Sequence, residues 1–534
     1  MIETIQILVV LLVVVAGVAV LSARLQIPSS ILLVIAGAGL ALVPGLPTVT
    51  LAPEFVLLVV LPPLIYSSAV AMSWREFLFN IRPISLLAVG CVAFTTIAVA
   101  AATRWLLGFP WPVGFVLGAI VSPPDAVAPL SIARRLQIPR RILVILEGEG
   151  LANDATALIL YRFAVGAVSL GVFSFGKAAA TFAAIVVGEV VWGIVAGWLM
   201  LRLRRWVRDP RVEITLSILT PYLAYWPPEY LGGSGVLATV TAGLYISWNG
   251  LRLISAATRL QGIFFWDLLI YLTEGMVFLI TGLQIRTLIS GITGYSLHDL
   301  VVSALVVCSV VIAARFIWMY PATYLPRWLV PAIARRDPSP PWQFPFALAF
   351  TGVRGIVSLA AALAIPLMTE DGRLFPNRDL ILFLTFSVIL VTLVGQGLLL
   401  PTVIRALGLA NAGVREHRAD RIEEFAARRR AVEAAIARLE ALGAERQFSK
   451  EVLEPLRARH RERLRHVAHR SDGDEKHQKL TETHDEIEFA LIEAERREIN
   501  ELYRQGQLKD EARRRIEREL DLREAHLVNI RAEE

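Results

Sequence analysis

Apolar residues follow one another along the first 410 residues in long, nearly uninterrupted runs. A helix that crosses a bilayer needs about 17–25 mostly apolar residues, and thirteen runs in this part of the chain approach that length. They lie near residues 5–23, 28–47, 54–72, 83–107, 112–133, 141–170, 176–201, 212–227, 234–250, 263–285, 298–325, 342–369 and 380–406. The pattern predicts an all-α polytopic membrane protein with about 13 transmembrane helices.

Two of these runs contain residues that break helices. Residues 122–129 read SPPDAVAP, with three prolines, and residues 351–358 read TGVRGIVS, with two glycines. Proline removes a backbone donor and clashes with the preceding turn. If the seventh run is a linker, both breaks fall in the fifth run of a six-run half. Matched breaks are typical of transporters with a midplane site, so we expect two inverted six-helix repeats with broken crossing helices.

Polar residues interrupt the sixth run in the stretch EGEGLANDATALIL, residues 147–160. It contains Glu147, Glu149, Asn153 and Asp154. A charged side chain at the centre of a bilayer costs about 2.5–3.5 kcal/mol on insertion scales, so packing alone does not explain four polar groups here. Asp154 follows the start of the run near Arg141 by thirteen residues, or roughly 20 Å of helix. The stretch therefore predicts a polar site near the middle of the membrane.

The distribution of charge divides the chain at about residue 411. Residues 411–534 contain 27 Lys and Arg and 29 Asp and Glu, whereas residues 1–410 contain 26 and 18. The whole chain is 55% hydrophobic, which is too apolar for an ordinary soluble protein. We expect a transmembrane exchange domain over residues 1–410 and a charged, helical, regulatory tail over residues 411–534.

Basic residues between the runs predict the orientation in the membrane. If the N-terminus lies outside, seventeen arginines fall in cytoplasmic loops and only five Lys or Arg residues fall in outside loops and span ends. Cytoplasmic loops carry an excess of Lys and Arg. The sequence therefore predicts a multi-pass protein of the inner, or plasma, membrane, with its C-terminal tail in the cytoplasm.

Other charged residues inside the runs are candidate partners of the polar stretch. A buried charge needs a partner, and pairing Glu149 with Arg315 of the eleventh run leaves Asp154 without a permanent cation. Arg354, inside the second break, is interpreted as a clamp on backbone carbonyls. Pro124 is a candidate support of the first break, and Glu274 and Ser67 are candidates for the ion path. Because a structural ion pair cannot readily release its partner, the unpaired Asp154 is the better candidate for a transport site.

The motifs together resemble the sodium/proton exchanger family, the electroneutral branch of the monovalent cation:proton antiporters in its bacterial form. The resemblance rests on five motifs, which follow one another along the membrane region in this order: VLLVVLPPLIYSSA (residues 56–69), SPPDAVAP, EGEGLANDATALILYRF, FWDLLIYLTEGMVFLITGLQ (residues 265–284) and GVRG. It implies that Asp154 binds the ion and carries the proton, and that Asn153 beside it and Asp125, the acidic residue of the first break, belong to the same ion-binding set. It further implies that Glu149 pairs with Arg315.

Two positions depart from the family pattern and bear on the choice of cation. Gly150 stands where the family commonly has serine, and Ser67 stands where it often has an acidic residue. Hard cations prefer oxygen ligands. Asp154, the carbonyls around Pro124 and nearby hydroxyl groups could supply them. We expect a proton and a monovalent cation, most readily Na⁺, to compete for Asp154, which therefore also serves as the metal ligand.

Three alternatives remain open at this stage. Potassium/proton exchange is the nearest, because the sequence does not fix the cation. A cation channel would need a ring of pore-lining residues, and no filter-like segment occurs. An intramembrane aspartyl protease could use Asp125 and Asp154, but a Gly-Leu-Gly-Asp type of motif is absent. We expect no enzymatic activity.

The expected partners are the lipid bilayer and a second copy of the chain, with no nucleic acid and no cofactor besides the transported cation and H⁺. Seven of the eight histidines lie in the tail: His417, His460, His466, His469, His477, His484 and His526. Histidine titrates near physiological pH. The tail is therefore a candidate for sensing pH or for stabilising a dimer, the alternative being an ordinary solvated helical segment.

Overall fold

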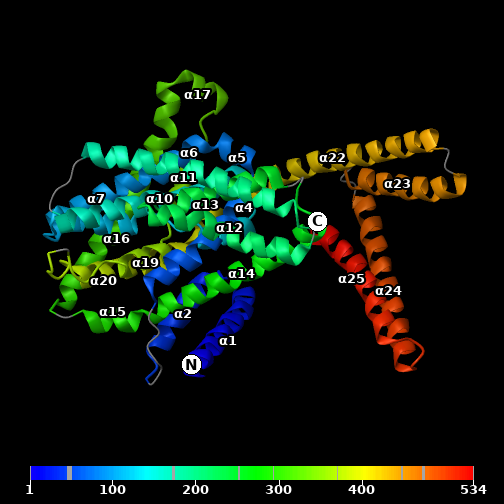
Figure 1. The fold of residues 1–534 in the computed structure, drawn as a ribbon. Helices are drawn as coiled ribbons and strands as arrows, with labels where there is room; N and C mark the ends of the chain where they lie inside the picture. The colour runs from blue at the N-terminus through cyan, green and yellow to red at the C-terminus, as the bar shows by residue number, and fades with distance from the viewer. Residues whose placement is uncertain are drawn as a thin grey trace. The chain divides into compact units, whose positions relative to one another are not determined.

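The computed structural model consists of helices joined by turns and loops, and its described residues contain one isolated β-bridge, between Met368 and Leu374 (Figure 1). The described residues are 2–44, 51–170, 175–207, 209–250, 253–292, 294–369, 371–446, 449–471 and 475–532. The chain divides into two compact units, Met1–Val414 and Arg415–Glu534. The boundary expected near residue 411 falls close to the start of helix α22 (Leu409–Arg446).

The first unit consists of helices that follow one another along the chain with short connections. Their bounds are α1 (Ile2–Leu25), α2 (Ser29–Ala41), α3 (Pro53–Phe55), η1 (Val56–Val60), α4 (Leu61–Ala71), α5 (Trp74–Phe79), α6 (Ile81–Ser85), η2 (Leu86–Cys91), α7 (Val92–Leu106), α8 (Trp111–Val121), α9 (Val127–Arg135), α10 (Arg140–Leu170), α11 (Phe175–Arg204), α12 (Pro210–Tyr230), α13 (Val236–Gly250), α14 (Ala256–Leu283), α15 (Ile285–Gly291), α16 (Leu297–Leu329), α17 (Pro331–Arg336), α18 (Gln343–Phe350), α19 (Ile356–Leu363), α20 (Arg378–Leu390), η3 (Val391–Gln396) and α21 (Gly397–Ala406). The three η elements are π-helical stretches that join the α-helices on either side of them.

Seven helical stretches are long and apolar enough to cross a membrane, among the residues that the structure describes. They are Gln6–Leu25, Pro53–Ala71, Ile81–Leu106, Gly176–Arg204, Ala256–Leu288, Leu297–Leu329 and Arg378–Ala406. The expectation of a polytopic, all-α membrane protein is confirmed at this level. The number of thirteen and the two inverted repeats stay predictions, since the remaining apolar helices are shorter, interrupted or more polar.

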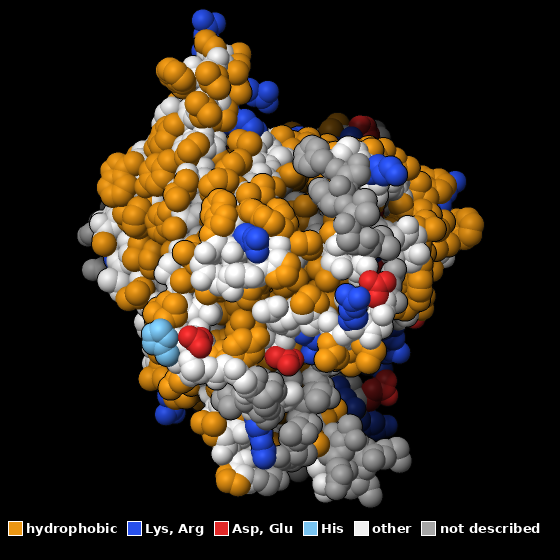
Figure 2. Space-filling model, turned by 90° about the vertical axis from the view of Figure 1, so that its left-hand side faces the viewer, with side chains coloured by type: hydrophobic (Ala, Val, Ile, Leu, Met, Phe, Trp, Pro, Cys, Tyr) orange, Lys and Arg blue, Asp and Glu red, His pale blue; other side chains and the backbone are white. Residues whose placement is uncertain are grey.

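Large apolar side chains point outward from the first unit. Val13 on α1 is 66% exposed and Val187 on α11 is 64% exposed. Figure 2 shows hydrophobic side chains gathered over the upper and left parts of the face that it displays, with a few charged side chains between and below them. An apolar exterior of this extent is the surface that a lipid environment requires, because acyl chains solvate it and water does not.

Glycines let helices α2 and α14 approach each other closely. A Cβ added at Gly37 would lie 3.0 Å from the Cα of Gly282 and also against the carbonyl of Leu279. Small residues at a helix crossing are typical of membrane proteins, where close backbone packing drives helix association. By contrast, a Cβ added at Gly39, on the same helix, would meet no atom within 4 Å.

Two carboxylates anchor the ends of helices in the first unit. Asp337 contacts Arg82 at 2.5 Å, Arg141 at 2.8 Å and Arg327 at 2.7 Å, which ties α6, α10 and α16 together. Glu189 on α11 accepts hydrogen bonds from the backbone N–H groups of Ser234, Gly235 and Leu237 at the start of α13. Glu189 therefore satisfies donors that a helix start leaves without intrahelical partners.

The second unit consists of α22 beyond Val414, α23 (Lys450–Ser471), α24 (Glu475–Arg504) and α25 (Asp510–Ala532). Arg496 on α24 contacts Asp521 and Glu524 on α25 at 2.8 and 2.7 Å. The side chains of His466, His469, His477, His484 and His526 lie outside the described part of the structure. The histidine hypothesis therefore stays a prediction.

Candidate ion-binding site

The two sequence breaks are breaks in the structure and lie against each other. Helix α8 ends at Val121 and α9 begins at Val127, while α18 ends at Phe350 and α19 begins at Ile356. The backbone N–H of Asp125, in the first break, donates a 2.6 Å hydrogen bond to the carbonyl of Val353, in the second. The two non-helical segments are thereby joined through their backbones, where proline and glycine prevent a continuous helix.

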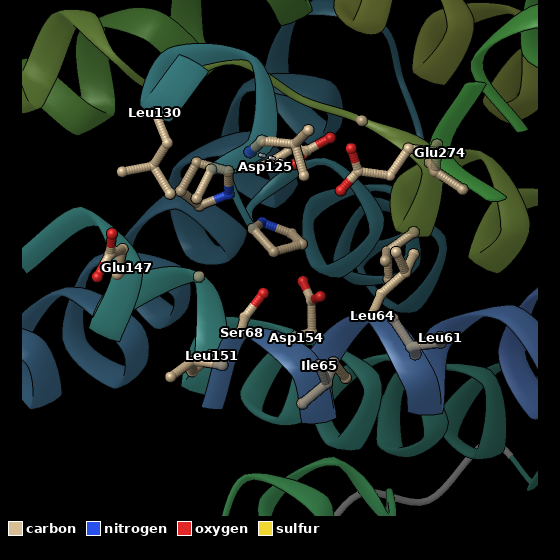
Figure 3. Close-up of a pocket in the computed structure, with 18 of the residues that line it drawn as sticks. Leu61, Leu64, Ile65, Ser68, Asp125, Leu130, Glu147, Leu151, Asp154 and Glu274 are labelled. Atoms are coloured by element: carbon tan, nitrogen blue, oxygen red, sulfur yellow. Dashed lines mark hydrogen bonds between the residues drawn. The ribbon is translucent and has the colours of Figure 1, made fainter. Parts of the chain in front are cut away.

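A cavity of about 460 Å³ lies beside the first break. Its walls come from α4, the segment 123–126, α9, α10, α14 and the start of α19. Asp154 and Ser68 project into it from one side, and Asp125 and Glu274 lie on the other side (Figure 3). The cavity therefore gathers four of the predicted site residues, Asp154, Asp125, Glu274 and Pro124.

Asp154 and Glu274 both line the cavity without a fixed partner. Within the described part of the chain, neither carboxylate has a hydrogen bond or an ion pair. A carboxylate without a permanent partner costs free energy when it lies inside the membrane. Such a residue is therefore typical of a functional site. No group of three or more His, Cys, Asp or Glu side chains among the described residues is arranged to hold a metal ion.

Asp125 and Asn153 are held by the break itself. The Oδ1 of Asp125 accepts a 2.9 Å hydrogen bond from the N–H of Val127, at the start of α9. The amide Nδ2 of Asn153 donates a 2.6 Å hydrogen bond to the carbonyl of Pro124. Asn153 is fully buried and does not line the cavity as described. This contact joins Asn153 to the first break, and its expected place among the ion-binding residues stays a prediction.

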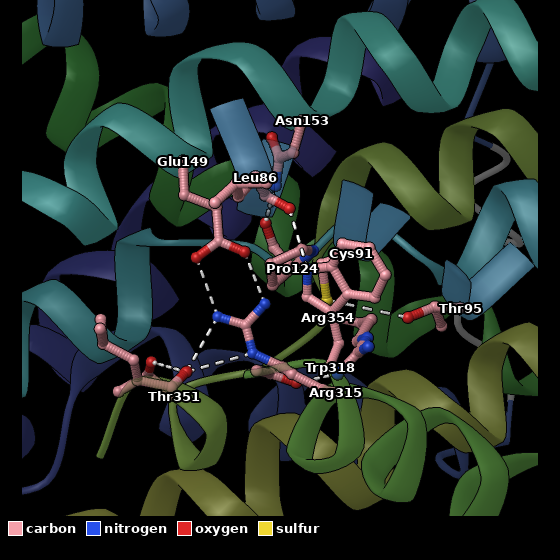
Figure 4. A network of polar contacts seen from close by, with 12 residues as sticks. Leu86, Cys91, Thr95, Pro124, Glu149, Asn153, Arg315, Trp318, Thr351 and Arg354 are labelled. Atoms are coloured by element: carbon pink, nitrogen blue, oxygen red, sulfur yellow. Dashed lines mark hydrogen bonds and ion pairs between the residues drawn. The ribbon is translucent and has the colours of Figure 1, made fainter. Parts of the chain in front are cut away.

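Glu149 and Arg315 form a buried ion pair with two hydrogen bonds, of 2.5 and 2.9 Å (Figure 4). Their side chains are only 2% and 1% exposed. Arg315 also donates from Nε and Nη2 to the carbonyl of Leu348 in α18. The pair proposed from the sequence is therefore present, and it fixes α10 and α16 to one side of the second break.

Arg354 binds backbone carbonyls from both breaks. Its Nε donates to the carbonyl of Val121 at 3.0 Å, and its Nη1 donates to the carbonyl of Gly352. Nη2 has no partner among the described residues. A cation at the C-terminal end of a helix is favourable, because the last carbonyls there carry partial negative charge. The contacts are those of a clamp on the broken helices.

The two departures from the family pattern have structural counterparts. A Cβ added at Gly150 would lie 2.8 Å from the Cβ of Ala126, so the packing leaves little room for serine there. The hydroxyl of Ser67 donates to the carbonyl of Leu64, and Ser67 is not among the described residues that line the cavity. The neighbouring Ser68 lines it instead, together with Ser358.

Sequence reasoning did not find Ser68, although its spacing contains a signal. Leu61, Leu64, Ile65 and Ser68 all line the cavity and recur at intervals of three or four residues. Residues so spaced share one face of a helix. The family motif indicates Ser67, whereas helical periodicity indicates Ser68.

Comparisons with known proteins show which sequences this chain resembles. The sequence profile described as sodium/hydrogen exchanger, transmembrane, matches residues 8–406. An uncharacterized Na(+)/H(+) exchanger of Mycobacterium tuberculosis is 34% identical over 518 residues, covering 96% of this chain and 94% of the relative. The Na(+)/H(+) antiporter of Aphanothece halophytica is 34% identical over 420 residues, covering 78% and 76%.

The fold also matches a solved structure. The sodium proton antiporter of Methanocaldococcus jannaschii at pH 8 superposes with a TM-score of 0.60 at 19% identity, covering 77% of this chain and 99% of that one. At this identity the likeness speaks for the fold alone. The resemblance seen in the motifs is confirmed by the profile and the relatives, and the chain belongs to the sodium/hydrogen exchanger family of membrane transporters.

Proposed function

We propose that this protein exchanges a monovalent cation, Na⁺ in the first place, for H⁺ across the membrane. Family membership supports cation/proton antiport in general. The observation that carries the finer proposal is the carboxylate of Asp154, which lines a cavity beside two broken helices and has no fixed partner in the described structure. Such a group can take up an ion and release it again.

Coupling follows from competition for this single carboxylate. A proton and a cation cannot occupy Asp154 together, so each ion leaves when the other binds. A bound cation would gain further oxygen ligands from Asp125, from Ser68 or from carbonyls of the break, since hard cations prefer oxygen. The neutral Asn153 beside Asp154 is consistent with the exchange of one cation for one proton, which would be electroneutral.

The surrounding polar groups keep the site in shape. Asn153 holds Pro124, Arg354 holds the ends of both breaks, and Glu149 with Arg315 fixes the helices behind them. In this proposal none of these four side chains exchanges ions. Glu274 contributes a further carboxylate on the wall opposite Asp154, where a cation on its way through the cavity can meet it.

Potassium/proton exchange is the second candidate. A Bacillus pumilus protein named as a sodium, potassium, lithium and rubidium/H(+) antiporter is 33% identical over 365 residues, which cover 66% of this chain and 54% of that protein. In addition, Gly150 supplies no side-chain oxygen at a position where the family commonly has one. A site with fewer fixed ligands discriminates less between cations of different size.

We further propose a location in the cell membrane, with the N-terminus outside and the tail in the cytoplasm, and a function in pH and sodium homeostasis. The apolar exterior of the first unit supports contact with lipid. A homodimer stays a proposal, as does a role of the tail in sensing pH. The channel and the protease have no support from family membership.

The test is a proteoliposome experiment with a pH-sensitive dye inside the vesicles. Adding Na⁺ to the outside should alkalinise the interior without a membrane current, and K⁺ and Li⁺ tested in parallel should rank the cations. An accompanying current, or no pH change with any cation, would contradict electroneutral cation/proton exchange.

A further inference from the structure

An ion pair borders the cavity at its more exposed end. Nη2 of Arg134 donates to Oε1 of Glu147 at 2.6 Å, and both residues line the cavity. The arginine side chain is 63% exposed and the glutamate side chain 16%. The pair, named here the entry pair, therefore lies between solvent and the interior of the cavity. Glu147 is seen at the edge of the cavity in Figure 3.

The entry pair links α9 to α10, and the carboxylates of Asp125 and Asp154 lie next to α9 and on α10. Glu147 precedes Asp154 by seven residues on α10, so the two share a face of the helix. Arg134 lies near the end of α9, and Asp125 stands two residues before that helix begins. Seven residues of helix correspond to roughly 10 Å. A cation travelling between this end of the cavity and Asp154 thus passes the entry pair first.

Stability does not account for this pair, because ion pairs with an exposed partner contribute little to it. Their charges nevertheless act on any ion that enters. Glu147 alone would attract and hold a cation, whereas Arg134 alone would repel one. Together they leave the entrance nearly neutral.

We propose that the entry pair controls cation access to Asp154: Glu147 is a first contact site for the incoming cation, and Arg134 is the resident counter-ion that the cation displaces. The inference rests on the proposed exchange function and adds an entry step to it. The neighbouring pair of Arg140 with Glu76 differs, because it is bidentate, at 3.0 and 2.8 Å, and Glu76 does not line the cavity as described.

The proposal predicts changes of opposite sign for the two single substitutions. Arg134→Gln frees Glu147 and should lower the half-saturating Na⁺ concentration, whereas Glu147→Gln leaves Arg134 uncompensated and should raise it. One charge acting over roughly 10 Å of partly solvated space corresponds to about a three-fold change in each direction. Arg134→Lys and the double variant Arg134→Gln/Glu147→Gln should both remain near wild type.

The experiment measures dye-reported H⁺ movement against Na⁺ concentration in inside-out and in right-side-out membrane vesicles. Added Na⁺ then meets each end of the protein in turn. Asp371→Asn and Arg373→Gln serve as charge-matched controls, because both residues are exposed in the loop that follows α19. Size-exclusion profiles of the purified variants check that each one is folded.

Opposite shifts in one vesicle orientation, reduced by added choline chloride and absent from the controls, would support the entry pair. The proposal would be overturned if the wild type exchanges ions and the two variants show no shift in half-saturating Na⁺ concentration, or shifts of the same sign, in both vesicle orientations. A wild-type protein that exchanges no cation would instead refute the proposed function, so the two failures are distinguishable.

Discussion

The amide of Asn153 donates a 2.6 Å hydrogen bond to the carbonyl of Pro124, so the residue next to Asp154 holds the break between α8 and α9. The position of the candidate ion site is therefore coupled to the shape of the broken helix. A shift of the break relative to α10 must lengthen or rupture this bond. This hydrogen bond makes the surroundings of Asp154 sensitive to any movement of the segment between α8 and α9.

Removing this bond should impair exchange more through geometry than through loss of a ligand. Asn153→Ala leaves the Pro124 carbonyl without its partner, at a cost of about 1–3 kcal/mol in the free energy of unfolding. We expect a lower maximal exchange rate, with the half-saturating Na⁺ concentration changed less. Dye-reported exchange and thermal unfolding of the purified variant measure both effects. A large loss of Na⁺ affinity at an unchanged maximal rate would identify Asn153 as a direct ligand.

The pair of Glu149 and Arg315 should matter for folding. Glu149→Gln or Arg315→Ala strands a buried charge, and breaking a buried pair costs about 3–5 kcal/mol. The exchanged double variant Glu149→Arg/Arg315→Glu should recover only part of this, because Arg315 also binds the carbonyl of Leu348. Melting temperatures in detergent measure the effect. Single variants as thermostable as the wild type would show that the pair does not hold the fold.

The crossing of α2 and α14 offers a matched comparison of two glycines on one helix. Gly37→Ala places a methyl group against Gly282 and should destabilise the protein by about 1–3 kcal/mol, as overpacking commonly does. Gly39→Ala meets open space and should be neutral or slightly stabilising, since alanine favours helix. Melting temperatures that fall equally for both variants would argue against a tight crossing.

The pH dependence of cation binding follows from competition at Asp154. As pH falls, a larger share of the carboxylate carries a proton, so more Na⁺ is needed to occupy it. The half-saturating Na⁺ concentration should therefore rise steadily as the pH is lowered, and Na⁺ binding should release protons. Isothermal titration calorimetry in buffers of different ionisation enthalpy detects the released protons. A binding constant independent of pH would contradict the competition.

The sequence predicted the breaks and the central charges well, because each has a strong local cause. Proline at 123 and 124 and glycine at 352 and 355 cannot continue a helix easily, whatever surrounds them. A charge such as Glu149 or Arg315 in an apolar run must find a partner, which restricts the pairs that are possible. The number of spans stays a prediction, since length and composition do not decide whether a short or interrupted apolar helix crosses the membrane.

Contacts that depend on distant segments could not be foreseen. Arg82, Arg141 and Arg327 meet at Asp337 only because three helices end at the same place. Ser68 is among the described residues that line the cavity and Ser67, which the family motif indicates, is not. The orientation of α4 places Ser68 toward the cavity, and the hydroxyl of Ser67 donates to the carbonyl of Leu64. In both cases the three-dimensional packing of helices, rather than a residue's own environment in the sequence, decides which side chains meet.

The measurement that tests the account most directly is cation-driven H⁺ movement by Asp154→Asn in proteoliposomes. This substitution keeps the size and most of the hydrogen-bonding capacity of the side chain but removes the charge and the proton site. The variant should fold and insert like the exposed control Asp371→Asn, yet exchange no cation, whereas the control should match the wild type. A folded Asp154→Asn protein that still moves protons at the wild-type rate when Na⁺ is added would contradict the central claim.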